Sequence, residues 1–166
     1  MIYTIQNEFL TVRVEDLGAQ LSSIQAPDGT EYLWQGDPDI WARRAPILFP
    51  FIARLRENTY YLDGQPYAIS THGFARDMVF SLADQGEDHI SLQLTDTPET
   101  RKVYPFSFSL TVTYTLEGNR LKKCHRVENR SDKDMYYELG AHDGFRAPVE
   151  PGVPMSSWSI RLPGVE

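Results

Sequence analysis

The chain has 166 residues, 41% of them hydrophobic and 12% aromatic, which is enough to bury the core of about one domain, so we expect one continuous domain over residues 1–166. A formal net charge of −7 and a pI near 5.1 exclude the extended basic surface that binds nucleic acid or an anionic membrane. No stretch approaches the ~20 consecutive apolar residues that a membrane-spanning helix needs.

The first residues are unlike a targeting segment. Met1 to Leu10 alternates apolar and polar side chains and lacks the basic segment and apolar run of a signal peptide. The single cysteine, Cys124, cannot form an internal disulfide, and we interpret it as a buried packing residue in a reducing compartment. We therefore expect a cytoplasmic protein.

Short apolar segments separated by turns predict an all-β fold, an antiparallel β-sandwich. Two of these segments come before turn dipeptides, Asp28-Gly29 and Asp63-Gly64. In chain order, the predicted short strands are Phe9 to Val14, Leu21 to Gln25, Thr59 to Leu62, Ile90 to Leu94 and Met135 to Leu139.

The clearest periodic signal runs from Phe106 to Leu116, where apolar residues alternate with serine and threonine. A period of two places one apolar face on a core, as in an antiparallel strand. The turn residues 117–119 follow, so Leu121 to Asn129 is predicted to return as the paired strand.

One segment predicts a helix. Thr97 is a favourable N-cap, Pro98 suits the first helical position, and Pro105 ends the helix within about two turns. Helix is therefore expected to be a minor component.

The end of the sequence resembles the beginning of another strand. Trp158, Ile160 and Leu162 alternate with polar residues, and the chain stops at Glu166. We expect a sandwich that is incomplete at this end, with exposed strand edges through which the protein could associate with itself.

The four histidines have different surroundings. His89 follows two acidic residues at a turn, and His125 lies in a strand among lysines and arginines, so both are interpreted as solvent-exposed. His72 precedes a glycine, which allows a backbone or ligand to approach closely, and His142 lies where a strand gives way to small residues. Both are candidates for proton transfer, although a structural role for each stays open.

Other chemistries have little support in the sequence. The histidines lack metal-ligand spacing, and no glycine-rich phosphate loop or nucleophile elbow is found, which leaves acid-base chemistry or binding. Aromatic residues near the polar loops could stack on the apolar faces of a sugar or could simply fill the core. They are Trp34, Trp41, Phe49, Phe51 and Phe74.

The order of motifs resembles the aldose 1-epimerase family, and most closely its bacterial LacX-like branch. The match extends over nearly the whole chain, and the number and order of its motifs carry the resemblance. They are Leu17-Gly18-Ala19-Gln20-Leu21, Glu31 to Trp34, Ala45 to Pro50, Arg54, the hairpin from Tyr60 to Tyr67, His72 to Asp77, Tyr104-Pro105-Phe106 and Gly140-Ala141-His142.

The resemblance implies a galactose mutarotase-like sandwich that interconverts the α and β anomers of an aldose. His142 matches the family's general acid, and His72 matches the second active-site histidine, which binds near the sugar ring oxygen. Arg54 matches the substrate-binding arginine, and Phe74 is the aromatic candidate for sugar binding. The chain departs from the branch after His142, where Asp143 and Arg146 stand in place of proline and asparagine, which implies different charges in the pocket.

The family's general base is a glutamate in the second half of its members, and this sequence has no counterpart; nothing around Glu166 matches it. The resemblance thus implies that the chain is the N-terminal part of such a domain and is inactive alone. The implied partner is a small sugar, phosphorylated or not, with no metal or organic cofactor. Two rival classes stay open: a carbohydrate-binding module without catalysis, which needs no base, and a structural protein, which needs no ligand pocket.

Overall fold

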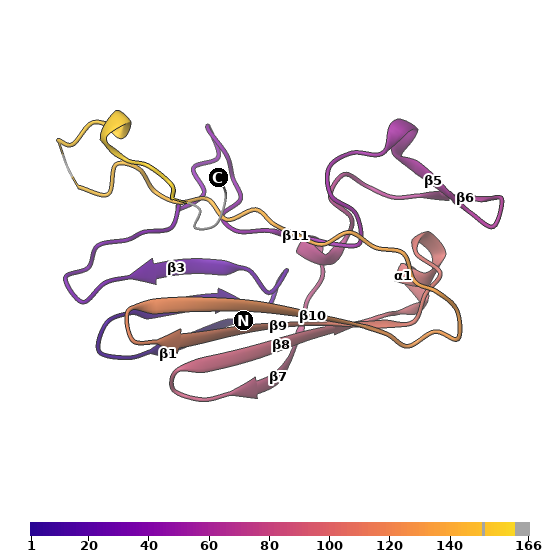
Figure 1. The fold of residues 1–166 in the computed structure, drawn as a ribbon, viewed down its shortest axis with the longest axis horizontal. Helices are drawn as coiled ribbons and strands as arrows, with labels where there is room; N and C mark the ends of the chain where they lie inside the picture. The colour runs from indigo at the N-terminus through magenta and orange to yellow at the C-terminus, as the bar shows by residue number, and fades with distance from the viewer. Residues whose placement is uncertain (151, 162–166) are drawn as a thin grey trace.

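The computed structural model describes residues 1–150 and 152–161, which form antiparallel sheets with little helix (Figure 1). A three-stranded sheet contains β1 (Ile2–Gln6), β2 (Thr11–Glu15) and β3 (Leu21–Gln25) in that order. A four-stranded sheet has the order β10 (Arg120–Asn129), β9 (Phe108–Glu117), β8 (His89–Thr95) and β7 (Ser81–Gln85). The expected all-β antiparallel architecture is confirmed.

Two small ladders complete the fold above these sheets in Figure 1. β4 (Ile47–Leu48) pairs with β11 (Gly140–Ala141), and β5 (Thr59–Leu62) pairs with β6 (Gln65–Ala68) in a hairpin at one end of the molecule. Short 3-10 helices η1 (Arg56–Asn58) and η2 (Ala75–Asp77) lie in connections between strands, and η3 (Met155–Ser157) follows the last strand of the described residues.

The predicted alternation from Phe106 to Leu116 forms the centre of the core. The apolar side chains of β9, among them Leu110, Val112 and Tyr114, are fully buried, while the threonines between them are partly exposed. The Tyr114 hydroxyl donates to the carbonyl of Ala19 at 2.8 Å, which ties β9 to the loop before β3. One continuous core therefore joins both sheets.

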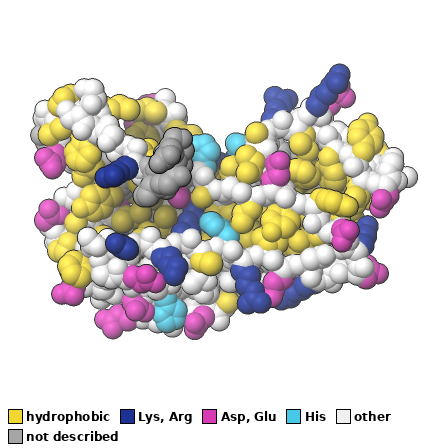
Figure 2. Space-filling model, in the orientation of Figure 1, with side chains coloured by type: hydrophobic (Ala, Val, Ile, Leu, Met, Phe, Trp, Pro, Cys, Tyr) yellow, Lys and Arg dark blue, Asp and Glu magenta, His cyan; other side chains and the backbone are white. Residues whose placement is uncertain are grey.

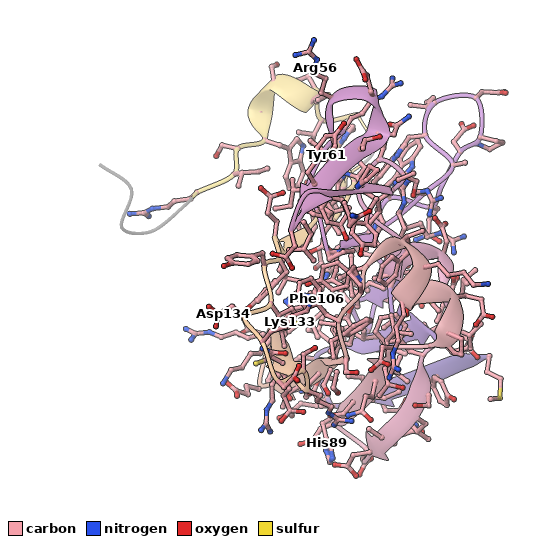
Figure 3. The ribbon with its side chains drawn as sticks, turned by 90° about the vertical axis from the view of Figure 1, so that its right-hand side faces the viewer. Arg56, Tyr61, His89, Phe106, Lys133 and Asp134 are labelled. Carbon is pink, nitrogen blue, oxygen red and sulfur yellow. The ribbon has the colours of Figure 1, made fainter. Side chains whose placement is uncertain are left out.

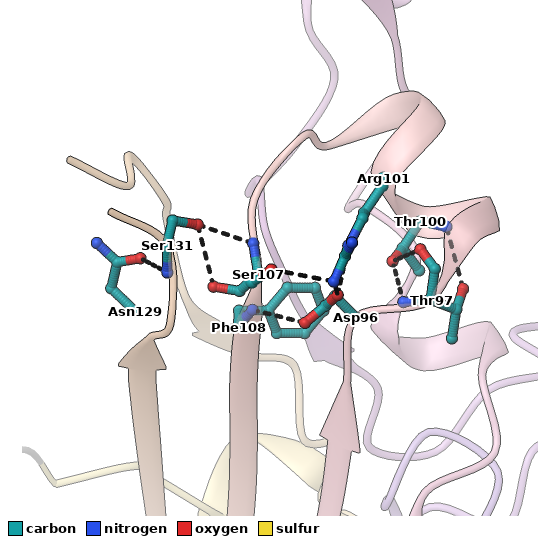
Figure 4. A network of polar contacts seen from close by, with 8 residues as sticks. All are labelled: Asp96, Thr97, Thr100, Arg101, Ser107, Phe108, Asn129 and Ser131. Carbon is teal, nitrogen blue, oxygen red and sulfur yellow. Dashed lines mark hydrogen bonds and ion pairs between the residues drawn. The ribbon is translucent and has the colours of Figure 1, made fainter. Parts of the chain in front are cut away.

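The predicted helix is α1 (Pro98–Val103), and its N-terminus is capped as expected. The Thr97 hydroxyl accepts from the Thr100 amide, and the Thr100 hydroxyl accepts from the Thr97 amide. Next to it, the carboxylate of Asp96 pairs with Arg101 and accepts from the Phe108 amide at 3.0 Å (Figure 4). This network joins α1 to the beginning of β9.

The strand predicted over Met135 to Leu139 does not form. In this segment the Glu138 amide donates to the carbonyl of Pro50, and the Tyr136 carbonyl accepts from the Tyr104 hydroxyl. Met135 and Leu139 still pack against the core. The ladder is confined to Gly140–Ala141 because prolines flank β4: Glu138 and His142 donate to the carbonyls of Pro50 and Pro46, but proline has no N–H to return either bond.

Three smaller expectations are also corrected. Phe9 lies in an exposed turn, where the Asn7 side chain accepts from its amide, so the second strand begins at Thr11. Cys124 is exposed because alternate residues of β10 face outward, and Cys124 is one of them. Residues 158–161 are not in a strand, and Leu162 lies outside the described residues.

Among the described residues, no helix has the length and hydrophobicity to cross a bilayer.

Candidate active site

The loop that carries His72 is held against the residue after β4. Phe49 and Gly73 form a parallel bridge, and the Phe74 amide donates to the Phe49 carbonyl at 3.0 Å. A Cβ on Gly73 would stand 2.1 Å from that carbonyl oxygen, and Gly73 has φ +72°. The close backbone approach expected beside His72 therefore depends on glycine.

Two hydrogen bonds with Ala53 fix the His72 ring. The His72 amide donates to the Ala53 carbonyl at 2.8 Å, and the Ala53 amide donates to His72 Nδ1 at 3.0 Å. Both residues have positive φ, +67° for His72 and +60° for Ala53. A backbone conformation that side-chain-bearing residues adopt rarely thus orients this side chain.

His142 reaches the same place from β11. Its amide donates to the Pro46 carbonyl at 3.1 Å, directly after the two residues that pair with β4. The ring centroid of His142 lies 6.2 Å from that of His72 and 5.0 Å from the Trp41 ring. The structure therefore brings the two sequence-predicted histidines together, because β4 and the residue after it contact both segments. Figure 2 shows histidine side chains gathered near the middle of this face.

Arg54 follows Ala53 along the chain, but its guanidinium group turns toward η1. Its Nε donates to Asn58 Oδ1 at 3.2 Å, and the side chain lines an open cavity of about 440 Å³ with Ser70 and Thr71. The backbone of Arg54 therefore lies near His72, because the preceding residue, Ala53, is hydrogen-bonded to His72. Its contact with a sugar stays a prediction.

The Phe74 ring is half-buried and packs against the core. Its centroid lies 6.0 to 6.2 Å from those of Phe49, Tyr104 and Phe108. Phe49 itself is fully buried, so its ring fills the core and does not face a ligand. Contact between Phe74 and a sugar also stays a prediction.

The sequence reasoning missed one charged group near His72, Arg43. Arg43 and Arg76 both pair with Asp77, at 2.8 and 3.5 Å, and Arg76 also donates to the Thr71 carbonyl at 2.8 Å. Arg76 thus fixes the loop that carries His72 from within the same segment. Partial burial, followed by the charges of Arg76, His142 and Arg43, lowers the pKa of His72. Nothing in the sequence spacing singles out Arg43, since only folding brings it close.

His89 is a surface residue, as expected. Its ring lies between Asp88 and Asp84, at 3.0 and 3.2 Å, on the β7–β8 hairpin. Figure 3 shows it at the opposite end of the molecule from Arg56 and Tyr61.

His125 is not on a solvated face. It is half-buried on the inner face of β10, in register with Val112 on β9, and its Nε2 has no hydrogen-bond partner among the described residues. Burial, and then the charge of Lys123, lowers its pKa. The expectation was wrong because the charged neighbours of His125 alternate between the two faces of the strand.

No cluster of three or more potential metal ligands is found among residues 1–150 and 152–161.

Comparison with known proteins identifies the family. The profile described as aldose 1-epimerase matches residues 1–162. The chain belongs to the aldose 1-epimerase family. The LacX protein (chromosomal) of Lactococcus lactis subsp. lactis is 37% identical over 172 residues, which cover 100% of this chain and 58% of that protein. The chain thus spans less than two thirds of the length of this curated relative.

Solved structures agree on the galactose mutarotase-like fold. A galactose mutarotase related enzyme from Lactobacillus acidophilus is 39% identical with a TM-score of 0.90, covering 93% of this chain and 52% of the other. A galactose mutarotase-like protein from Lactobacillus casei ATCC 334 is 36% identical with a TM-score of 0.85, covering 87% of this chain and 50% of the other. The family resemblance of the sequence motifs is therefore confirmed.

Proposed function

We propose that this chain carries the acid side of an aldose 1-epimerase site, which interconverts the α and β anomers of an aldose. The observation that supports this most is the pair of rings, His72 and His142, whose centroids are 6.2 Å apart on segments joined by β4. Family membership supports the same reaction class. The sugar, with or without a phosphate group, would bind beside these rings in a cytoplasmic protein.

In this proposal His142 protonates the ring oxygen of the sugar while a base removes the proton of the anomeric hydroxyl. The bond between C1 and the ring oxygen breaks, C1 turns, and the ring closes on its other face, which returns both protons. A histidine titrates near neutrality and suits the acid role. The family resemblance assigns the base to a glutamate in the part of the relatives that this chain does not span.

Polarimetry on a freshly dissolved aldose tests the proposal in the longer protein. We expect His142→Ala to lower turnover by at least ~10²-fold with a smaller effect on sugar affinity, because a general acid acts mainly in the transition state. His89→Ala is the control, since His89 is on a distant hairpin. An unchanged rate in folded His142→Ala protein would contradict the proposal.

The 166-residue chain is compared with the longer protein in the same assay. Lacking one of two proton carriers, it should be slower by roughly 10²- to 10⁴-fold. Sugar binding by the longer protein without any turnover would instead support a carbohydrate-binding module. Sedimentation of the same samples tests whether exposed strand edges cause self-association.

A further inference from the structure

We propose that Trp41 is a positioning residue, whose indole ring holds the imidazole ring of His142 in place for proton transfer. The transfer itself rests on the proposed function. The packing of the two rings rests on their own contacts and on the backbone that carries them, so it can be tested without any reaction.

Few contacts hold the His142 ring. The side chain is exposed, and within residues 1–150 and 152–161 its ring nitrogens have no hydrogen-bond partner. Its aromatic neighbours are Trp41, at a centroid distance of 5.0 Å with the planes tilted by 43°, and His72 at 6.2 Å. An exposed side chain changes rotamer on a picosecond to nanosecond timescale unless something packs against it. The nearer ring, Trp41, is therefore the main restraint on His142.

Trp41 is itself fixed by its backbone. The Trp41 amide donates to the Asp37 carbonyl at 2.7 Å, and the Trp41 carbonyl accepts from Trp34 Nε1 at 2.7 Å. The Trp41 side chain is half-buried, and an indole has only two rotatable bonds to order. It can therefore serve as a rigid support for a neighbouring side chain.

The segments that carry Trp41 and His142 are also joined directly, at Gly144. The Gly144 amide donates to the Arg44 carbonyl at 2.8 Å, and its carbonyl accepts from the Trp34 amide at 2.9 Å. A Cβ on Gly144 would stand 2.7 Å from Trp41 Cζ3. The two segments thus meet at a distance that leaves no room for a larger residue, which keeps the indole ring close to His142.

Such a support matters for a proton carrier in particular. A general acid must come within about 2.6–3.2 Å of the atom that it protonates, and a displacement of about 1 Å can cost ~10²-fold in rate. A ring packed on one side against an indole has few orientations left, while its other side and its nitrogens stay open to a ligand. Trp41 would therefore raise the rate of proton transfer and contribute little to sugar affinity.

Nuclear Overhauser effects (NOEs) in the 166-residue chain test the packing without any substitution. We expect NOEs between the indole protons of Trp41 and the ring protons of His142, whose chemical shifts the indole ring current should displace. Trp41→Leu should abolish this displacement. Trp158→Leu is the matched control and should preserve it, because Trp158 lines a cavity with Phe145 and Ile160. Absence of the NOEs, or equal shifts in the two variants, would overturn the inference.

Polarimetry on variants of the longer protein tests the role. We expect Trp41→Leu to lower kcat by ~10- to 10²-fold while KM changes less than about threefold. Trp41→Phe keeps an aromatic ring beside His142 and should stay within about threefold of the original kcat. Gly144→Ala displaces the indole without replacing it and should lower kcat as Trp41→Leu does.

An unchanged kcat in Trp41→Leu, or equal losses in the leucine and phenylalanine variants with unchanged unfolding curves, would contradict the positioning role. A rise in KM alone would also contradict it, because it would make Trp41 a contact of the sugar. If the longer protein lacks epimerase activity altogether, the proposed function fails, while the NOEs still decide whether Trp41 holds the His142 ring.

Discussion

Lys123 on β10 and Asp143, the residue after His142, form an ion pair with an Nζ–Oδ1 distance of 2.8 Å. The two side chains are only 12% and 20% exposed. The Lys123 ammonium also lies 5.7 Å from the centre of the Tyr114 ring, in the middle of the core. The Asp143 carboxylate therefore has a cation partner, and the ion pair holds the His142 segment to the four-stranded sheet.

We expect Asp143→Asn to lower the free energy of unfolding by about 1–3 kcal/mol, because it leaves the Lys123 charge largely covered and without its partner. Urea denaturation measures the change. Glu117→Gln is the matched control, since Glu117 and Lys122 form an exposed ion pair on the same hairpin and should contribute less than about 1 kcal/mol. Equal effects of the two substitutions would show that the covered pair has no special importance.

The strands that the sequence predicted well are those whose signal is local. Leu21–Gln25 and Thr59–Leu62 form as predicted, because turn residues follow each segment within three positions, at Asp28-Gly29 and Asp63-Gly64. Met135 to Leu139 forms no ladder, because a strand also needs a partner, and the segment opposite it contains Pro50, which has no N–H to donate. Pairing is a property of the tertiary fold that a single segment does not encode.

In the candidate site, too, the sequence predicts local features but not the contacts that depend on the tertiary fold. The motifs around His72 and His142 suggested each residue separately, but their proximity depends on the two-residue pairing of β4 and β11 and on the bridge to Gly73. Such short contacts have no sequence period. His125 is different, since its spacing of two from Lys123 and Val127 could have shown that it shares their inner face.

Gly73→Ala should be one of the most destabilising single substitutions in the chain. The added Cβ would meet the Phe49 carbonyl at 2.1 Å, and the residue must also keep a positive φ, so we expect a loss of at least about 3 kcal/mol. Gly118→Ala is the control, because its φ is +60° but nothing lies within 4 Å of the added atom; it should lose about 1 kcal/mol. Similar melting temperatures for the two variants would contradict the close approach.

The histidines should titrate in a definite order. Burial and the neighbouring cations lower the pKa of His72, whereas hydrogen bonds to Asp88 and Asp84 raise the pKa of His89. In an NMR titration, His72 should therefore change charge below the ordinary value of about 6.5 and His89 above it. The reverse order would contradict the charge distribution described for the two sites.

The same shifts give opposite contributions to stability. As the pH falls, the unfolded chain binds a proton at His72 near pH 6.5, whereas the folded chain binds it only at a lower pH. The contribution of His72 to the free energy of unfolding therefore falls as the pH drops through its folded pKa. The contribution of His89 is complete below about pH 6.5 and is lost as the pH rises through its own, higher pKa.

Urea denaturation at a series of pH values measures both contributions. Relative to the original protein, His72→Gln should lose less stability on acidification, because glutamine takes up no proton, and His89→Gln should lose less as the pH rises above about 6.5. Parallel stability profiles for the original protein and both variants would show that neither histidine is coupled to folding.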